Sequence, residues 1–119
     1  MTKVVTRFAP SPTGTLHIGG VRTALFNYVY AKQNNGLFLV RIEDTDKERS
    51  TKEFEKNILD SLNSIGLSPD KKPINQSERN DIYVNAAQKI FDSGKAYWCD
   101  CSKEELDKMR MEQEAAGKK

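Results

Sequence analysis

The chain has 119 residues, of which 37% are hydrophobic and 30% charged, and its formal net charge is +2. That length suits one domain, and the charge is too small to indicate nucleic-acid binding from bulk electrostatics. The sequence has no apolar run of about 18 residues and no apolar leader after Met1, so it predicts neither a membrane span nor a signal peptide. The apolar share is low for a globular domain, which indicates a large surface or an incomplete domain.

The first elements expected are a strand, a loop and a helix. Residues 4–6 are β-branched and predict a buried strand. After a loop rich in Pro, Ser and Gly, a helix is expected from about Gly20 to Gln33, ending at Asn34-Asn35-Gly36. Its apolar face would comprise Val21, Ala24, Leu25, Tyr28 and Val29. A strand that leads through a loop into a helix N-terminus places free N–H groups where a phosphate could bind.

Residues 37–42 predict a second strand, which is apolar almost throughout and is expected to be buried on both faces. A strand, a helix and a strand within about 40 residues make a βαβ unit with parallel strands and a right-handed crossover. The acidic run 43–46 follows at the carboxyl end of the second strand. Because open α/β sheets bind ligands at that edge, the sequence predicts an α/β fold with a site there.

Two further helices are expected after the acidic run. Ser50 with Glu53 is a capping box for the first, which would end at Gly66 and precede a loop over 68–73. Its buried residues would be Phe54, Ile58, Leu62 and Ile65. The next helix is expected over 78–93, capped by Ser77 and stopped by Gly94. Its inward residues would be Ile82, Ala86, Ile90 and Phe91.

The remaining sequence predicts a brief strand over 96–98 and a last helix. Ser102 with Glu105 is the capping box of that helix, whose apolar face is thin and consists mainly of Leu106 and Met109. Since this helix needs a partner and two or three strands make only part of a doubly wound sheet, the chain is expected to be a piece of a larger domain.

His17-Ile18-Gly19-Gly20 at the start of the first helix has two interpretations. The imidazole and the glycine N–H groups could bind phosphate oxygens as negative charge builds in a transition state. Alternatively, His17 caps the helix and the glycines only turn the chain. The segment is neither a dinucleotide fingerprint nor a P-loop.

The run Arg7-Phe8-Ala9-Pro10-Ser11-Pro12-Thr13-Gly14, followed by His17-Ile18-Gly19-Gly20, resembles the HIGH-type signature of class I aminoacyl-tRNA synthetases in its glutamyl branch. The blocks at 22–27, 40–46 and 76–79, and Tyr83, continue the resemblance, which covers at least residues 4–101. It implies the first half of a Rossmann-like catalytic domain over residues 1–95 and the start of an inserted acceptor-binding region over 96–119.

The resemblance also implies a reaction and its residues. The family activates glutamate with ATP and Mg²⁺ and transfers the glutamyl group to the 3′ end of tRNA(Glu), with positioning and electrostatics governing the first step. The catalytic residues would be His17, Gly19 and Gly20. ATP would be bound by the same three and Thr13. Glutamate would be bound by Arg7, Ala9, Ser11 and Glu43. Asp46 and Arg49 would lie near the tRNA terminus. The residues alone favour a surface ion pair for Arg7, and Glu43 could be a helix-capping or solvated carboxylate.

On a strand, Cys99 and Cys101 would lie farther apart than the about 4 Å between Cβ atoms that a disulfide allows, so they form a poor disulfide pair. They could supply half of a zinc site. Some family members hold zinc through such a pair and two later ligands, which would fall past Lys119. The resemblance otherwise implies a cytoplasmic enzyme without membrane partners, expected to be a monomer.

Three other interpretations stay open. A glutamyl-queuosine tRNA(Asp) synthetase shares the first blocks and the Cys-x-Cys pair but not the 22–27 block. A glutaminyl-tRNA synthetase differs in its loop prolines. The chain could also be a non-catalytic fragment or interaction module. The family's second, KMSKS-like signature is absent from these 119 residues, so we expect the chain alone to be inactive.

Overall fold

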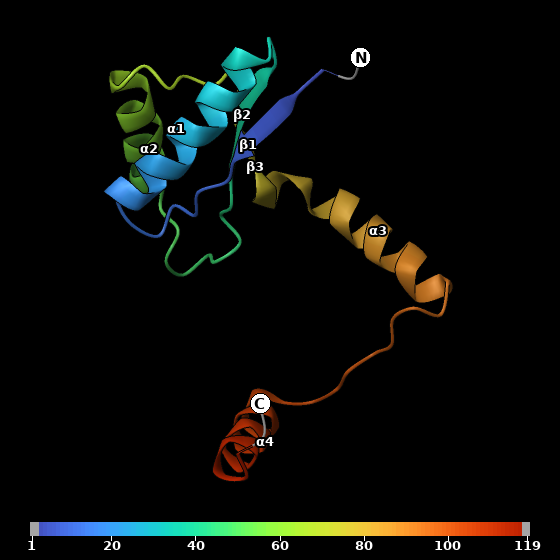
Figure 1. Ribbon diagram of the computed structural model, residues 1–119. Helices are drawn as coiled ribbons and strands as arrows, with labels where there is room; N and C mark the ends of the chain where they lie inside the picture. The colour runs from blue at the N-terminus through green and yellow to red at the C-terminus, as the bar shows by residue number, and fades with distance from the viewer. Residues whose placement is uncertain (1–2, 118–119) are drawn as a thin grey trace. The chain divides into compact units, whose positions relative to one another are not determined.

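The computed structural model describes residues 3–117 (Figure 1), and the chain divides between Ile82 and Tyr83 into two units, each described by itself. The elements in chain order are β1 (Val5–Phe8), α1 (Ile18–Gln33), β2 (Leu37–Ile42), α2 (Lys52–Ser64), β3 (Ile74–Asn75), a 3₁₀ helix (Gln76–Arg79), α3 (Asn80–Asp92) and α4 (Lys103–Ala115). The predicted domains, 1–95 and 96–119, stay a prediction, and their residues 1–2 and 118–119 lie outside the described part.

The first unit is built on three parallel strands in the order β1-β2-β3. Val5 pairs with Leu37 and Phe8 with Val40, so β1, α1 and β2 form the predicted parallel βαβ unit. Figure 1 shows α1 and α2 beside these strands. The α/β class is confirmed, and so are the bounds of β2. β3 was not predicted, because two residues after Pro73 become a strand only through pairing with Arg41 and Ile42.

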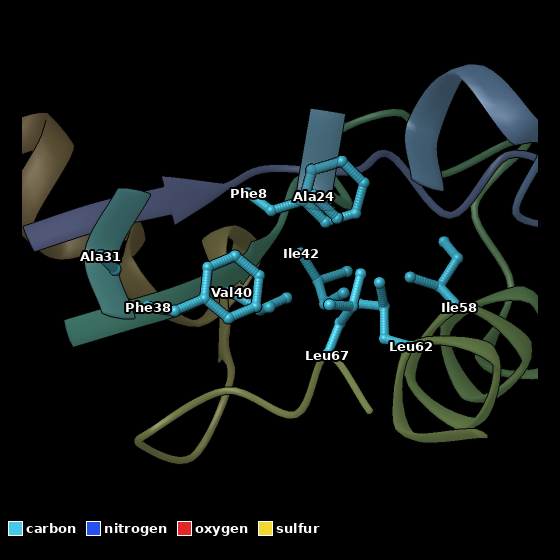
Figure 2. Packing of buried hydrophobic residues seen from close by; sticks show 9 residues of the cluster. All are labelled: Phe8, Ala24, Ala31, Phe38, Val40, Ile42, Ile58, Leu62 and Leu67. Atoms are coloured by element: carbon cyan, nitrogen blue, oxygen red, sulfur yellow. The ribbon is translucent and has the colours of Figure 1, made fainter. Parts of the chain in front are cut away.

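The core lies on one face of the sheet only. It consists of Phe8, Ala24, Ala31, Phe38, Val40, Ile42, Ile58, Leu62 and Leu67 (Figure 2). Alternate residues of β2 are buried, whereas Leu37 and Leu39 are half-buried, so burial on both faces is wrong. Val5 is 54% exposed, so β1 is not a buried strand either. The physical reason is that α1 and α2 both supply their side chains to the same face.

Helix α1 packs through small residues rather than through its large ones. Ala24 and Ala31 are fully buried, and Tyr28 contacts the Phe38 ring edge-on at a centroid distance of 5.6 Å. Leu25 and Val29 were expected on the buried face but are exposed. Alanine at the contact lets the helix approach the sheet closely, which leaves the larger side chains at its margin.

Helix α2 is capped by Thr51, not by Ser50 as predicted. The Thr51 hydroxyl accepts a hydrogen bond from the Phe54 N–H at 3.1 Å. The helix buries Ile58 and Leu62, but Ile65 is exposed and Leu67 takes the expected place in the core. The stop at Gly66 is confirmed, since this glycine has a φ of +77°, which L side chains rarely adopt.

The helix expected over 78–93 begins as the 3₁₀ helix and continues as α3. Ser77 does not cap it; its side chain binds Asp44 instead. The stop at Gly94 is confirmed by a φ of +72°. Ile82 and Ile90 are about half exposed and Ala86 is exposed, so the predicted inward face is not buried among the described residues.

In the second unit, Phe91 and Trp98 pack with ring centroids 5.5 Å apart. Residues 96–98 form no strand among the described residues, since no other strand pairs with them. The capping box of α4 is confirmed: Ser102 accepts from the Glu105 N–H at 3.2 Å, and Glu105 accepts from the Ser102 N–H at 2.7 Å. No helix within residues 3–117 is long and apolar enough to cross a bilayer.

Candidate functional site

The loop between β1 and α1, residues 9–17, is here called the signature loop. Three hydrogen bonds to other segments hold its main chain. The Glu43 N–H donates to the Pro10 carbonyl at 2.9 Å, and the Thr51 N–H donates to the Pro12 carbonyl at 3.1 Å. The Leu16 N–H donates to the Asn57 side chain of α2 at 3.1 Å. The loop is therefore fixed at its start, middle and end.

His17 is the N-cap of α1. Its Nδ1 accepts the Gly19 N–H at 3.1 Å, so the capping interpretation of His17 is correct for this state of the chain. In a neutral ring whose Nδ1 accepts, the proton lies on Nε2, which remains free to donate to a ligand. Phosphate binding through Nε2 would therefore use a different ring nitrogen from the cap, so the observed cap does not exclude it.

An added Cβ on either glycine would come close to a neighbouring side chain. A Cβ on Gly19 would lie 2.9 Å from the His17 ring, and one on Gly20 would lie 2.8 Å from the Leu16 side chain. Both are flexible side chains that could move, but moving the His17 ring would break the cap. Glycine at these positions keeps the helix start open and the imidazole in place.

A cavity of about 310 Å³ opens at this helix start. It is lined by Phe8, Pro10, Ser11, Gly14, Thr15, Leu16, His17, Gly19, Gly20, Thr23 and Ile58. The structure thus brings together Ser11, His17, Gly19 and Gly20 of the predicted site residues. Thr13 and Ala9 belong to the same loop but do not line the cavity.

Arg7 lies on the other face of the sheet. It is exposed and in register with Leu39, whereas its neighbour Phe8 points into the core. Side chains alternate along a strand, so Arg7, Leu39 and Arg41 share the face that the helices leave open. On that face Glu43 forms an ion pair with Arg41. The Arg41 side chain is 23% exposed and the Glu43 side chain is 31% exposed. Arg7 and Glu43 are therefore not part of the cavity at the helix start.

Asp46 and Arg49 lie together on residues 43–51, here called the acidic loop. Their side chains form an ion pair at 2.6 Å, and the Arg49 N–H also donates to Asp46. The hydrogen bonds from the Arg49 side chain and main chain lower the pKa of Asp46. Arg49 is 73% exposed, so its guanidinium is accessible from solvent.

Cys99 and Cys101 are both exposed free thiols. The N–H and the thiol of Cys101 lower the pKa of Cys99, and the hydrogen bond with Cys99 raises that of Cys101. Within residues 3–117 no three His, Cys, Asp or Glu side chains cluster so that they could hold a metal ion. Two thiols meet half of the requirement of a structural zinc. The described residues therefore do not fit a zinc site by themselves.

Two groups near the site were missed by sequence reasoning. Arg41 pairs with Glu43, and strand alternation could have indicated this because the two are two residues apart. Asp44 binds Ser77 and Asn75, which are more than 30 residues away in the chain. No local signal in the sequence points to that contact.

These features define an α/β unit with a cavity at the junction of strand and helix. The comparisons agree with this class: residues 3–119 match the family described as tRNA synthetases class I (E and Q), catalytic domain. The chain therefore belongs to the catalytic-domain family of class I tRNA synthetases (E and Q).

The similar proteins carry a more particular name. The glutamate–tRNA ligase of Chromobacterium violaceum is 61% identical over 114 residues, which cover 96% of this chain and 25% of that protein. That of Coprothermobacter proteolyticus is 55% identical over 116 residues, or 98% and 25%. A crystal structure of a glutamate tRNA ligase from Elizabethkingia meningosepticum in complex with its amino acid has a TM-score of 0.88 at 47% identity, with coverage of 98% and 25%. The chain spans about a quarter of the length of the curated relatives it matches.

Proposed function

We propose that this chain is part of a glutamate–tRNA ligase, which activates glutamate with ATP and transfers it to the 3′ end of tRNA(Glu). The observation that carries the proposal is the match of nearly the whole chain, at 61% identity, to a protein of that name, signature loop included. The enzyme is expected to be a cytoplasmic monomer. None of the similar proteins reported above is named a glutamyl-queuosine synthetase, so the main interpretation is favoured over that alternative.

In the first step, an oxygen of the glutamate α-carboxylate would attack the α-phosphorus of ATP. A bond to that phosphorus forms while the bond to the leaving pyrophosphate breaks. The cavity at the helix start is the place for the phosphates, because it combines the Nε2–H of His17 with the positive end of the α1 dipole. Gly19 and Gly20 would leave room for the phosphates, and Thr13 would support the loop beside them. These donors would stabilise the charge on the pentavalent phosphorus.

Glutamate would be recognised by charge at both ends. The planar guanidinium of Arg7 can bind the side-chain carboxylate through two hydrogen bonds, and Glu43 can accept the α-ammonium. Both side chains belong to the open face of the sheet, near the carboxyl ends of β1 and β2. Ser11 and the Ala9 main chain, in the signature loop, would complete the pocket. Asp46 and Arg49 would lie near the terminal nucleotides of the tRNA.

The expected metal ions are Mg²⁺ and Zn²⁺. Mg²⁺ would enter with the ATP phosphates, whose charge it neutralises, and no protein cluster within residues 3–117 is suited to hold it. A structural Zn²⁺ would need two ligands in addition to Cys99 and Cys101. The proposed roles of His17, Arg7 and Glu43 depend on neither.

The proposal is tested by glutamate-dependent ATP–pyrophosphate exchange in a full-length ligase that carries these 119 residues. We expect exchange with glutamate and none with glutamine. Arg7→Ala should raise the KM for glutamate by about 100-fold, since a desolvated charged pair contributes about 2–5 kcal/mol, and should change the KM for ATP much less. Arg110→Ala is the matched control, because that exposed arginine forms only a surface ion pair with Asp107. An unchanged glutamate KM in Arg7→Ala would remove Arg7 from the pocket, and absence of exchange would refute the function.

A further inference from the structure

Asp44, the residue after Glu43, is the centre of a hydrogen-bond cluster that the proposed reaction does not use. Its Oδ1 accepts the Ser77 N–H at 2.9 Å, and its Oδ2 accepts the Ser77 hydroxyl at 2.5 Å. The Asn75 side-chain amide lies 3.4 Å from the same Oδ2. The end of β2 is thereby tied to the segment in which β3 passes into the 3₁₀ helix.

Asn75 connects this cluster to α2. It is a buried polar residue, 7% exposed, and its Nδ2 also donates to Glu55 at 3.0 Å. Glu55 in turn pairs with Lys52 at 2.9 Å. Burial tends to raise the pKa of Asp44, but the hydrogen bonds from Ser77 and Asn75 outweigh it and lower that pKa. Asp44 is therefore a carboxylate at neutral pH, with both oxygens engaged.

The cluster and the signature loop hold the same stretch of main chain. The Glu43 N–H donates to the Pro10 carbonyl, and one residue on, the Asp44 side chain binds Ser77. The Glu43 side chain pairs with Arg41 of the open sheet face, whereas Asp44 lies with Asn75 and Glu55, on the side of α2. These two anchors flank the peptide between residues 43 and 44 and oppose its rotation, which favours a Glu43 carboxylate on the open face.

From this arrangement we propose that Asp44 is a positioning residue, which acts through Glu43 on the recognition of the substrate α-ammonium. The inference rests on the proposed function, because it assigns Asp44 a role in the glutamate site. Asp44 touches no substrate itself. Its effect should therefore fall on glutamate binding and not on the phosphates, which lie at the start of α1.

The test compares three variants of the full-length ligase in glutamate-dependent exchange. Asp44→Asn preserves the shape of the side chain. It presents an amide N–H₂ at the position of Oδ2, which in the wild type accepts from the Ser77 hydroxyl and the Asn75 amide. It should raise the KM for glutamate about tenfold or more, because a misplacement of about 1 Å can cost up to 10²-fold, while the KM for ATP stays within about twofold. Ser77→Ala keeps the hydrogen bond from the Ser77 N–H to Asp44 but loses the one from the Ser77 hydroxyl. It should therefore raise the KM for glutamate less than Asp44→Asn does.

Asp70→Asn is the matched control. Asp70 also accepts a main-chain N–H of β2, that of Phe38 at 2.7 Å, but at the strand's other end. It should lower the melting temperature without changing the KM for glutamate. Equal glutamate KM values in Asp44→Asn and Asp70→Asn would overturn the inference, and if Asp44→Asn does not fold, an unchanged KM in Ser77→Ala would do so. A wild-type enzyme without glutamate-dependent exchange would instead refute the proposed function.

Discussion

Replacing His17 in two ways separates helix capping from phosphate binding. In the structure Nδ1 accepts the Gly19 N–H at 3.1 Å, so the proposed phosphate contact would use the other ring nitrogen, Nε2. His17→Ala removes both. His17→Asn keeps an oxygen that can accept at the cap, but its side chain ends before the position of Nε2, so the donor is lost.

The two effects differ in size as well as in kind. Loss of an N-cap acceptor costs about 0.5–2 kcal/mol of stability, and the exposed position of His17 indicates the lower part of that range. Loss of one transition-state donor costs about 10²- to 10³-fold in kcat, equivalent to about 2.7–4 kcal/mol. His17→Ala should therefore lose both stability and rate, whereas His17→Asn should lose rate alone.

The assay is glutamate-dependent ATP–pyrophosphate exchange in the full-length ligase, with thermal unfolding measured on the same preparations. A His17→Asn enzyme with a wild-type kcat would refute the assignment and leave His17 as a helix cap only. A His17→Ala enzyme with wild-type stability would show that the cap hydrogen bond contributes nothing in solution.

Three other predictions concern the chain and its folding. The isolated 119-residue chain should show no glutamate-dependent exchange, and robust exchange would contradict its dependence on the second signature. Gly36→Ala should lower the free energy of unfolding by about 1–3 kcal/mol, because the new Cβ would overlap the Val4 carbonyl oxygen. Gly14→Ala should leave it unchanged, because the space around Gly14 is open, and chemical unfolding of both variants checks this. Hydrogen bonds from Lys32 and the Phe38 N–H lower the pKa of Asp70 below its ordinary value of 3.8 in the folded chain. The ionised Asp70 therefore stabilises the folded state fully above pH 3.8, and this stabilisation is lost as the pH falls through the lower folded-state pKa. An acid unfolding curve of Asp70→Asn that matches wild type would contradict this.

The sequence was informative wherever a single segment decides the structure. The apolar run of β2 and the capping box at Ser102 were both predicted correctly, since each depends on residues close in the chain. Thr51 displaced Ser50 as the cap of α2 because the Thr51 N–H is bound to the Pro12 carbonyl, a contact 39 residues distant that no local pattern contains.

Tertiary context also explains the remaining errors. Residues 96–98 have the composition of a strand, but no described strand lies beside them. Leu25 and Val29 of α1 are exposed because Ala24 and Ala31 make the contact of the helix with the sheet. For the site, the sequence predicted His17 with its glycines and the carboxyl end of β2, and this stays a prediction. The distribution of its residues over a cavity and the opposite sheet face follows from strand register, which only the structure gives.

The signature loop and the acidic loop are joined at two points by main-chain atoms, at Pro10 with Glu43 and at Pro12 with Thr51. Because these two ties use main-chain atoms, they do not depend on the side chains of residues 45–50, but inserting or deleting one residue there would shift one tie against the other. We therefore expect the lengths of the signature loop and of the acidic loop to be conserved together among members of the family. Anyone exchanging segments between relatives, for instance to alter which amino acid is activated, should transfer the two loops as a pair.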